Sequence, residues 1–214
     1  MGLKPRRIAV LLSGRGSNLR ALHEAIAQGR LKADLVAVGS DQPQAAGVAW
    51  AREQGLPVHV CPRTAFADRA TFESALLTPI SAAQPDWLIL AGFMRVLSAQ
   101  TVAQWQGRML NLHPSLLPRH PGLDTHRKAL SAGDAEHGAS VHFVSEVLDG
   151  GPVIAQVAFP LDPTATPESL AVGLQPLEHR LLTEVVGWAV AGRLSLREGR
   201  VQLDDQTLQA PRRL

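Results

Sequence analysis

The alternation of short apolar runs with amphipathic segments is the feature that most restricts the fold of this chain. Five strand-like runs and four helix-like segments follow one another up to residue 112. Their spacing is typical of repeated strand–helix–strand units, whose strands lie parallel and whose helices cover both faces of a sheet. We therefore predict a doubly wound α/β fold with a mostly parallel central sheet, Rossmann-like in its N-terminal half.

The individual elements follow from apolar periodicity and from glycine or proline at the boundaries. The expected strands are Arg7–Leu12, Ala33–Gly39, Pro57–Cys61, Asp86–Ala91 and Arg108–Leu112. The expected helices are Ser17–Gln28, capped by Ser17 and ended by Gly29, then Gln44–Gln54, Arg69–Ala83, shortened or interrupted near Pro79, and Ala99–Trp105.

The pattern changes after residue 113, where a proline-rich loop begins. Two later strands follow without a helix between them, so we expect them to pair antiparallel. A long helix then leads to a terminal β-hairpin. In order, these segments are the loop Pro114–Gly122, the strands Ser140–Val144 and Val153–Phe159, the helix Pro167–Ala191, and the hairpin Leu194–Leu203, which turns at Glu198 and Gly199.

Composition excludes several classes of protein. A length of 214 residues suits a single domain. The 21 basic residues nearly balance the 19 acidic ones, and they form no basic block of the kind that binds nucleic acid. One cysteine permits no intrachain disulfide, and no apolar run approaches the ~18 residues of a membrane span. We expect a cytoplasmic protein, monomer or homodimer, with neither nucleic acid nor membrane as a partner.

The stretch GRGSN, Gly14–Asn18, lies between an expected strand and an expected helix. The backbone N–H groups at a helix start carry partial positive charge and bind anions. The stretch lacks the lysine of a Walker loop and the third glycine of a dinucleotide fingerprint. It is equally consistent with a phosphate loop at Gly16, Ser17 and Asn18 and with a tight turn that needs a positive φ.

Asn111, His113 and Asp149 are candidates for catalysis. Asn111 and His113 are two apart on an expected strand, so their side chains face the same way at its carboxyl end, where α/β sheets bind ligands. Asp149 precedes two glycines, and a carboxylate beside a histidine raises the pKa of the ring. Turn formation and structural hydrogen bonding remain alternatives for all three residues.

Metal and acyl-enzyme chemistry fit the sequence poorly. The five histidines between positions 113 and 142 do not form His-Glu-x-x-His, and no cysteine joins them. We therefore expect no metal. The Gly-x-Ser-x-Gly elbow of serine hydrolases is also missing from the sequence.

Four segments together strongly resemble the formyltransferase fold family, and the resemblance extends from about residue 7 to about residue 203. The glycine loop and Glu178 favour the branch that formylates glycinamide ribonucleotide with 10-formyltetrahydrofolate in purine biosynthesis. We expect neither the tRNA-binding barrel nor the regulatory domain of other branches. The segments are RIAVLLSGRGSNLRAL (7–22), LAGFMRVL (90–97), NLHPSLLPRHPGLDTH (111–126) and HGASVHFVSEVLDGGPVIAQ (137–156).

The resemblance implies roles for individual residues. Asn111 and His113 would polarise the formyl oxygen, and Asp149 would move a proton through a water that Ser140 helps to hold. The implied nucleotide-binding residues are Gly16, Ser17, Asn18, Gln175 and Glu178. The implied folate-binding residues are Arg69, Met94, Arg95, Val96, Leu97, Asn111, Ser145, Glu146 and Leu148. A nucleotide-binding half, 1–110, and a catalytic, folate-binding half, 111–214, would make up one domain.

Two positions depart from the family pattern. Asp124 stands where a histidine is expected, and His120 where tyrosine or phenylalanine is common. Three other functions stay open: formyl transfer to a sugar nucleotide or amino sugar, hydrolysis of the formyl folate, and nucleotide binding without catalysis.

Overall fold

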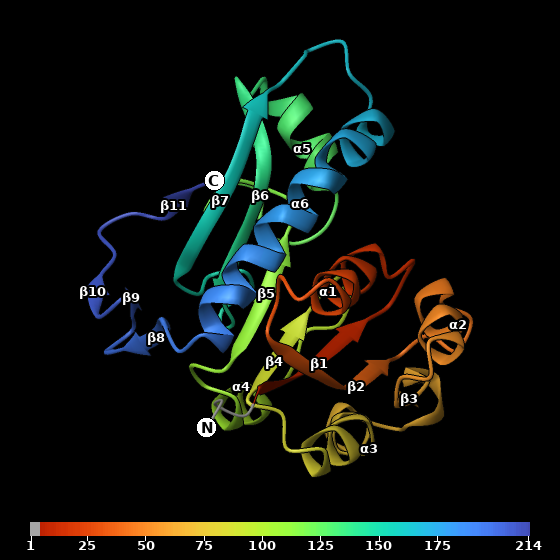
Figure 1. Ribbon diagram of the computed structural model, residues 1–214. Helices are drawn as coiled ribbons and strands as arrows, with labels where there is room; N and C mark the ends of the chain where they lie inside the picture. Colours follow the sequence, from red (N-terminus) through yellow and green to blue (C-terminus); the bar gives the residue numbers. More distant parts are fainter. Residues whose placement is uncertain (1–4) are drawn as a thin grey trace.

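The computed structural model describes residues 5–214, which form two sheets flanked by helices (Figure 1). The strands are β1 (Arg6–Leu12), β2 (Ala33–Ser40), β3 (Val58–Val60), β4 (Trp87–Leu90), β5 (Met109–His113), β6 (Glu136–Phe143), β7 (Val153–Pro160), β8 (Leu194–Arg197), β9 (Arg200–Leu203), β10 (Gln206–Thr207) and β11 (Arg212–Arg213). The helices are α1 (Ser17–Ala27), α2 (Ala46–Glu53), the short 3-10 helix Arg63–Ala65, α3 (Arg69–Ala82), α4 (Ala99–Gln104), α5 (Thr125–Ala132) and α6 (Pro167–Val190).

The main sheet has eight strands in the order β11-β7-β6-β5-β4-β1-β2-β3. Strands β1 to β5 are parallel, whereas β6 runs antiparallel to both β5 and β7. Strands β8, β9 and β10 form a separate antiparallel sheet, and β8 and β9 are the expected terminal hairpin. The predicted fold class is therefore confirmed.

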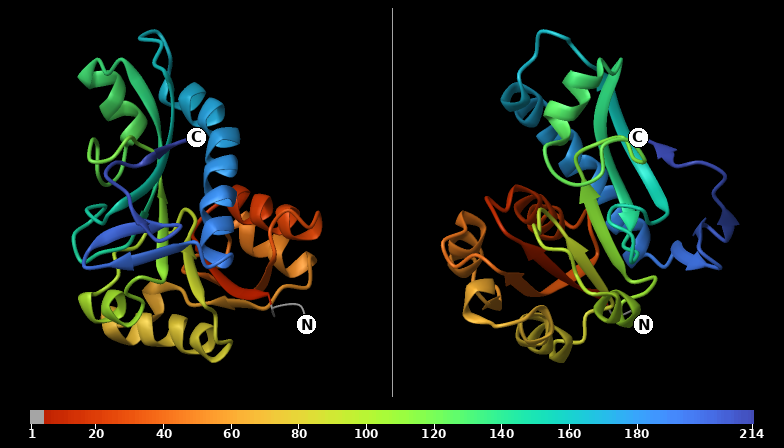
Figure 2. Two further views of the ribbon diagram at one scale, coloured as in Figure 1. Left: turned by 60° about the vertical axis from the view of Figure 1, so that its left-hand side comes forward. Right: turned by 180° about the vertical axis from the view of Figure 1, so that it is seen from behind.

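Strand β1 is buried on both faces, which explains its continuous apolar sequence. Ile8, Val10 and Leu12 belong to a core with α1, α2 and α6, whereas Ala9 and Leu11 belong to a second core with α3 and α4. Both views in Figure 2 show α6 running beside β6 and β7. In residues 5–214, no helix combines the length and the apolar character that a bilayer-spanning segment requires.

Three local predictions were wrong or incomplete. Helix α3 continues through Pro79, because Leu76 and Ile80 on either side of it are fully buried and their packing outweighs the lost N–H donor. Gly16, not Ser17, is the N-cap of α1, and no side chain caps this helix. Helix α5 was not predicted, since its sequence THRKALSA is largely polar.

The strand order reverses at β1, which pairs with β2 on one side and with β4 on the other. The loops that follow β1 and β4 therefore leave the sheet toward different helices, and a crevice opens at the carboxyl ends of the strands. Ser13 N–H donates to the Gly92 carbonyl across this crevice at 2.9 Å. The glycine loop, the segment after β4 and the end of β5 thus meet at one edge of the sheet.

Candidate active site

Asn111, His113 and Asp149 lie within reach of one another at the end of β5. Asp149 Oδ1 accepts a hydrogen bond from Asn111 Nδ2 at 3.3 Å, and Asp149 Oδ2 lies 3.4 Å from His113 Nδ1. The turn after β6 that carries Asp149 needs its glycines, because a Cβ at Gly151 would lie 1.8 Å from the Phe143 carbonyl oxygen. Asp149 itself has a φ of 49°.

The loop between Pro114 and Gly122 covers this group. Gly122 N–H donates to Asp149 Oδ2 at 2.8 Å, and His113 Nε2 lies 3.0 Å from the His120 carbonyl oxygen. A carbonyl oxygen only accepts, so His113 Nε2 carries the proton in this contact.

Burial and hydrogen bonding shift the pKa values of this group in opposite ways. Burial by itself would raise the pKa of Asp149, but the nearby His142 ring, the Gly122 N–H bond and the His113 ring together hold that pKa below its usual range. Burial lowers the pKa of His113, and the raising effects of the His120 carbonyl and of Asp149 do not outweigh it. Asp149 does act to raise the pKa of His113, as expected from the sequence, but burial is the larger effect and the net pKa is lowered.

His142 is a member of the site that the sequence did not reveal. Its ring is buried, and Nδ1 lies 2.8 Å from the carbonyl oxygen of Phe143, so Nδ1 carries a proton in this contact. Nε2 then accepts from Asn111 Nδ2 at 3.0 Å. Asn111 and His142 are register partners in β5 and β6, a long-range pairing that no local pattern indicates.

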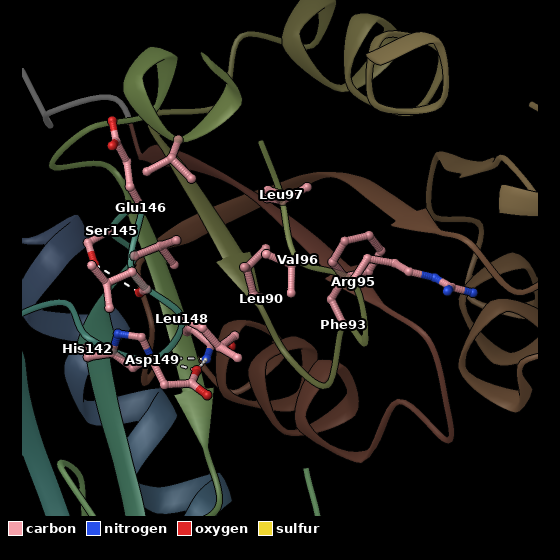
Figure 3. A pocket seen from close by; sticks show the side chains of 14 residues that line it. Leu90, Phe93, Arg95, Val96, Leu97, His142, Ser145, Glu146, Leu148 and Asp149 are labelled. Atoms are coloured by element: carbon pink, nitrogen blue, oxygen red, sulfur yellow. Dashed lines mark hydrogen bonds and ion pairs between the residues drawn. The ribbon is translucent and has the colours of Figure 1, made fainter. Parts of the chain in front are cut away.

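A pocket opens beside this group, and Figure 3 shows the side chains around it. Most of its lining residues are apolar, and Asn111, His142 and Asp149 are among its polar ones, a combination typical of sites for small organic molecules. Of the predicted folate residues, Arg69 and Met94 do not line it: Arg69 is an exposed first residue of α3, and the Met94 side chain points into solvent. The lining residues are Leu90, Phe93, Arg95, Val96, Leu97, Val102, Asn111, His142, Val144, Ser145, Glu146, Val147, Leu148 and Asp149.

The predicted nucleotide residues meet at the start of α1. Asn18 Nδ2 lies 3.4 Å from Glu178 Oε2 on α6, and the buried Asn18 Oδ1 has no partner among residues 5–214. Burial raises the pKa of Glu178, while Asn18 and the charge of Arg15 act in the opposite direction. Gln175 lies three residues before Glu178 on α6, so both face the same side of that helix.

Gly16 satisfies both interpretations of the glycine loop. Its φ is 74°, and a Cβ there would lie 2.7 Å from Gly47 Cα, so the position requires glycine for steric reasons. The same conformation begins α1, whose first N–H groups have no partners within the helix. One conformation of the loop therefore contains both the tight turn and the unpartnered N–H groups that an anion site requires.

The role expected for Ser140 was wrong. Its buried hydroxyl donates to the Ser115 carbonyl at 2.7 Å and accepts from Leu117 N–H at 3.0 Å and from Gln156 Nε2 at 2.9 Å. These bonds use its one donor and both lone pairs. Ser140 therefore holds the loop after β5 and has no hydrogen-bonding capacity left for a water.

The two departures from the family pattern lie on the covering loop and at the start of α5. His120 Nε2 lies 2.7 Å from Asp134 Oδ2, and Arg119 pairs with Asp134 Oδ1 at 3.2 Å. Asp124 is the N-cap of α5 with a φ of 59°, and its side chain makes no capping bond. Within residues 5–214 no three His, Cys, Asp or Glu side chains are grouped so that they could hold a metal ion.

Comparison with known proteins identifies the family. The profile described as Formyl transferase matches residues 6–186. The chain belongs to the formyl transferase family. Phosphoribosylglycinamide formyltransferase of Escherichia coli (strain K12) is 43% identical over 201 residues, which are 94% of this chain and 95% of that protein.

Two solved structures of the family are also similar. The phosphoribosylglycinamide formyltransferase of Coxiella burnetii, in complex with CHES, has a TM-score of 0.93 and 42% identity, with 98% of this chain and 99% of that chain covered. A formyltetrahydrofolate deformylase from Burkholderia mallei has a TM-score of 0.83 and 30% identity, but covers 93% of this chain and only 70% of that one.

Proposed function

We propose that this chain transfers the formyl group of 10-formyltetrahydrofolate to the amine of glycinamide ribonucleotide. The products are formylglycinamide ribonucleotide and tetrahydrofolate, and the step belongs to purine biosynthesis. The proposal draws support from the near full-length similarity to phosphoribosylglycinamide formyltransferases. The single observation that carries it is the contact of Asp149 with both Asn111 and His113 at the end of the pocket.

The two substrates approach this group from opposite sides. The formyl donor occupies the pocket, with its reacting group toward Asn111 and Asp149. The phosphate of the ribonucleotide lies at the start of α1, where free N–H groups and the helix dipole favour an anion. Glu178 accepts hydrogen bonds from the ribose hydroxyls.

We propose a single domain for residues 1–214, and both of its halves contribute described residues to each proposed site. Arg95, Val96 and Leu97, from the first half, line the donor pocket. Glu178, from the second half, lies beside the glycine loop. The proposed division at residue 110 therefore separates the chain in sequence and not the two sites in space.

The reaction is a direct transfer. The neutral amine attacks the formyl carbon, negative charge develops on the formyl oxygen, and the bond between that carbon and N10 breaks. Asn111 Nδ2 and His113 Nε2 donate to the formyl oxygen. His113 therefore first gives up its contact with the His120 carbonyl, and Asn111 gives up one of its two N–H contacts, with His142 or with Asp149. The lowered pKa of Asp149 leaves it ionised at neutral pH, ready to take the proton of the attacking amine and pass it to N10.

The test is release of tetrahydrofolate from 10-formyltetrahydrofolate, measured with and without glycinamide ribonucleotide. Release that requires the ribonucleotide is expected. His113→Ala and Asp149→Asn should each lower kcat by about 10²–10³, and weaken ribonucleotide binding much less. His59→Gln, on the distant edge strand β3, is the control and should leave kcat unchanged. Near-normal turnover in either site variant would contradict the assigned role.

Hydrolysis of the formyl donor is a second candidate, favoured by the similarity to a formyltetrahydrofolate deformylase. Release of tetrahydrofolate at the same rate with and without the ribonucleotide would support it. We further propose a cytoplasmic location and a monomer or homodimer without nucleic-acid or membrane partners. Analytical ultracentrifugation distinguishes the two oligomeric states.

A further inference from the structure

The wall of the donor pocket after β4 has no regular secondary structure. Residues 92–98 belong to neither a helix nor a strand, although Arg95, Val96 and Leu97 line the pocket. The main-chain N–H and C=O groups of these three residues have no hydrogen-bond partner within residues 5–214. A segment without ladder or helix bonds needs other contacts to keep one shape.

Asp41 holds the first part of this segment. It follows β2 directly, and its side chain is 0% exposed. One carboxylate oxygen accepts from Arg95 Nε at 2.6 Å, and the other accepts from Ser13 Oγ at 2.5 Å. Ser13 Oγ in turn accepts from Met94 N–H at 2.9 Å. A single buried carboxylate therefore fixes two consecutive residues of the pocket wall.

The direction of the Arg95 side chain supports this interpretation. Figure 3 shows its guanidinium turned away from Asp149 and Leu148, on the far side of the wall. The charge of Arg95 is thus paired with Asp41 outside the pocket. What Arg95 presents to the pocket is the part of the residue nearest the main chain.

Glu73 on α3 holds the other end of the segment. Its side chain is buried, and it accepts from Ser98 N–H at 2.8 Å, from Ser98 Oγ at 2.5 Å and from Thr101 Oγ1 at 2.5 Å. These bonds fix the last residue of the wall and the start of α4. Burying a carboxylate is costly unless its hydrogen bonds are made, and here this segment and α4 supply all of them.

We propose that Asp41 and Glu73 are positioning residues that hold residues 92–98 in the shape that binds the formyl donor. The proposal rests on the function proposed above. Neither carboxylate lines the pocket. Each acts through the segment: Asp41 through Arg95 and Ser13, Glu73 through Ser98.

Asp41→Asn and Glu73→Gln test this in the full chain. A lost hydrogen bond to a charged group corresponds to a change of about tenfold or more, so each variant should raise KM for 10-formyltetrahydrofolate by about tenfold. The kcat and the KM for glycinamide ribonucleotide should change less than about threefold. Asp86→Asn is the matched control. Asp86 also joins two chain segments, through the Arg6 side chain and Arg7 N–H, but it lies at the amino ends of β1 and β4, away from the pocket. It should lower the melting temperature and leave both KM values unchanged.

Amide hydrogen exchange gives a measurement that does not depend on activity. Exchange at Met94 should accelerate in Asp41→Asn, and exchange at Ser98 should accelerate in Glu73→Gln. Should Asp41→Asn fail to fold, Ser13→Ala removes the Met94 bond and the Ser13 bond to Asp41, keeps the pair between Arg95 and Asp41, and should raise the same KM. An active enzyme whose variants keep the donor KM and the amide protection would overturn the inference.

A double-mutant cycle separates anchoring from direct binding. If Arg95 acts only through Asp41, then Asp41→Asn and Arg95→Gln combined raise the donor KM no more than Asp41→Asn alone. Multiplying effects would place the guanidinium on the donor and overturn the anchoring role. If the wild-type protein releases no tetrahydrofolate, the proposed function fails, and amide exchange still decides whether the two carboxylates hold the segment.

Discussion

The two glycines that flank α1 allow a matched test of the phosphate loop. Gly16 precedes the helix with a φ of 74°, and Gly29 follows it with a φ of 70°. Alanine at either position must adopt a left-handed conformation. The positions differ in space: a Cβ at Gly16 would lie 2.7 Å from Gly47 Cα, whereas a Cβ at Gly29 would meet nothing within 4 Å.

The expected magnitudes follow from this difference. The left-handed conformation costs a non-glycine residue about 1–2 kcal/mol, and this is the whole effect expected for Gly29→Ala. Gly16→Ala must also move two backbones apart, which adds about 1–3 kcal/mol. For a chain of this size each kcal/mol lowers the melting temperature by about 2–4 °C, so Gly16→Ala should melt clearly below Gly29→Ala.

Urea denaturation gives the two free energies of unfolding, and steady-state kinetics gives the KM for glycinamide ribonucleotide. Only Gly16→Ala should raise that KM, because the displaced backbone carries the N–H groups of Gly16, Ser17 and Asn18. Equal loss of stability in the two variants, together with an unchanged KM, would refute the argument that contact with Gly47 sets the position of the loop.

Three further predictions concern other parts of the chain. Burial lowers the pKa of His137 to about 4. Between pH 6.5 and 4 the unfolded chain therefore binds a proton at His137, whereas the folded chain does not. Urea titrations should show stability falling between pH 6.5 and 4, less steeply in His137→Gln; parallel curves would contradict this. Because burial raises the pKa of Glu178, the KM for glycinamide ribonucleotide should rise as the pH falls toward that pKa. Glu178→Gln should raise this KM at every pH. If the variant keeps the pH profile of the wild type, Glu178 does not bind the ribonucleotide. Pro79→Ala restores an N–H donor inside α3 and should raise the free energy of unfolding by about 1–3 kcal/mol. Thermal melting measures this gain, and an unchanged melting temperature would contradict the prediction.

The fold was predictable because its signal is local and periodic. Buried parallel strands such as β1 and β4 are continuous apolar runs, and every α-helix except α3 ends near a glycine. Pro79 was misjudged because local propensity disfavours proline within a helix, while the packing of Leu76 and Ile80 comes from strands distant in sequence. Helix α5 was missed because few of its residues face a core.

The candidate site was only partly predictable. The spacing of Asn111 and His113 places them on one face of a strand, but no local rule brings Asp149 to them. Only the family resemblance did so. His142 depends on the register between β5 and β6, and that register is fixed by the whole sheet.

Buried polar anchors were the least visible part of the sequence. Asp41, Glu73 and Ser140 occur singly, without a repeat or a neighbouring motif. Their partners lie 16 or more residues away, except for the Gln42 side chain beside Asp41. A carboxylate in such a place looks like a surface residue until the tertiary structure supplies its donors.

The loop over the candidate catalytic group also sets when His113 can act. The His120 carbonyl holds the proton of His113 Nε2, whereas Gly122 N–H occupies only one of the lone pairs of Asp149. In the proposed mechanism, a formyl donor that enters the pocket therefore meets His113 still bonded to the main chain. His113 becomes a donor to the formyl oxygen once this contact opens, so the timing of transfer depends on a main-chain contact rather than on an additional side chain.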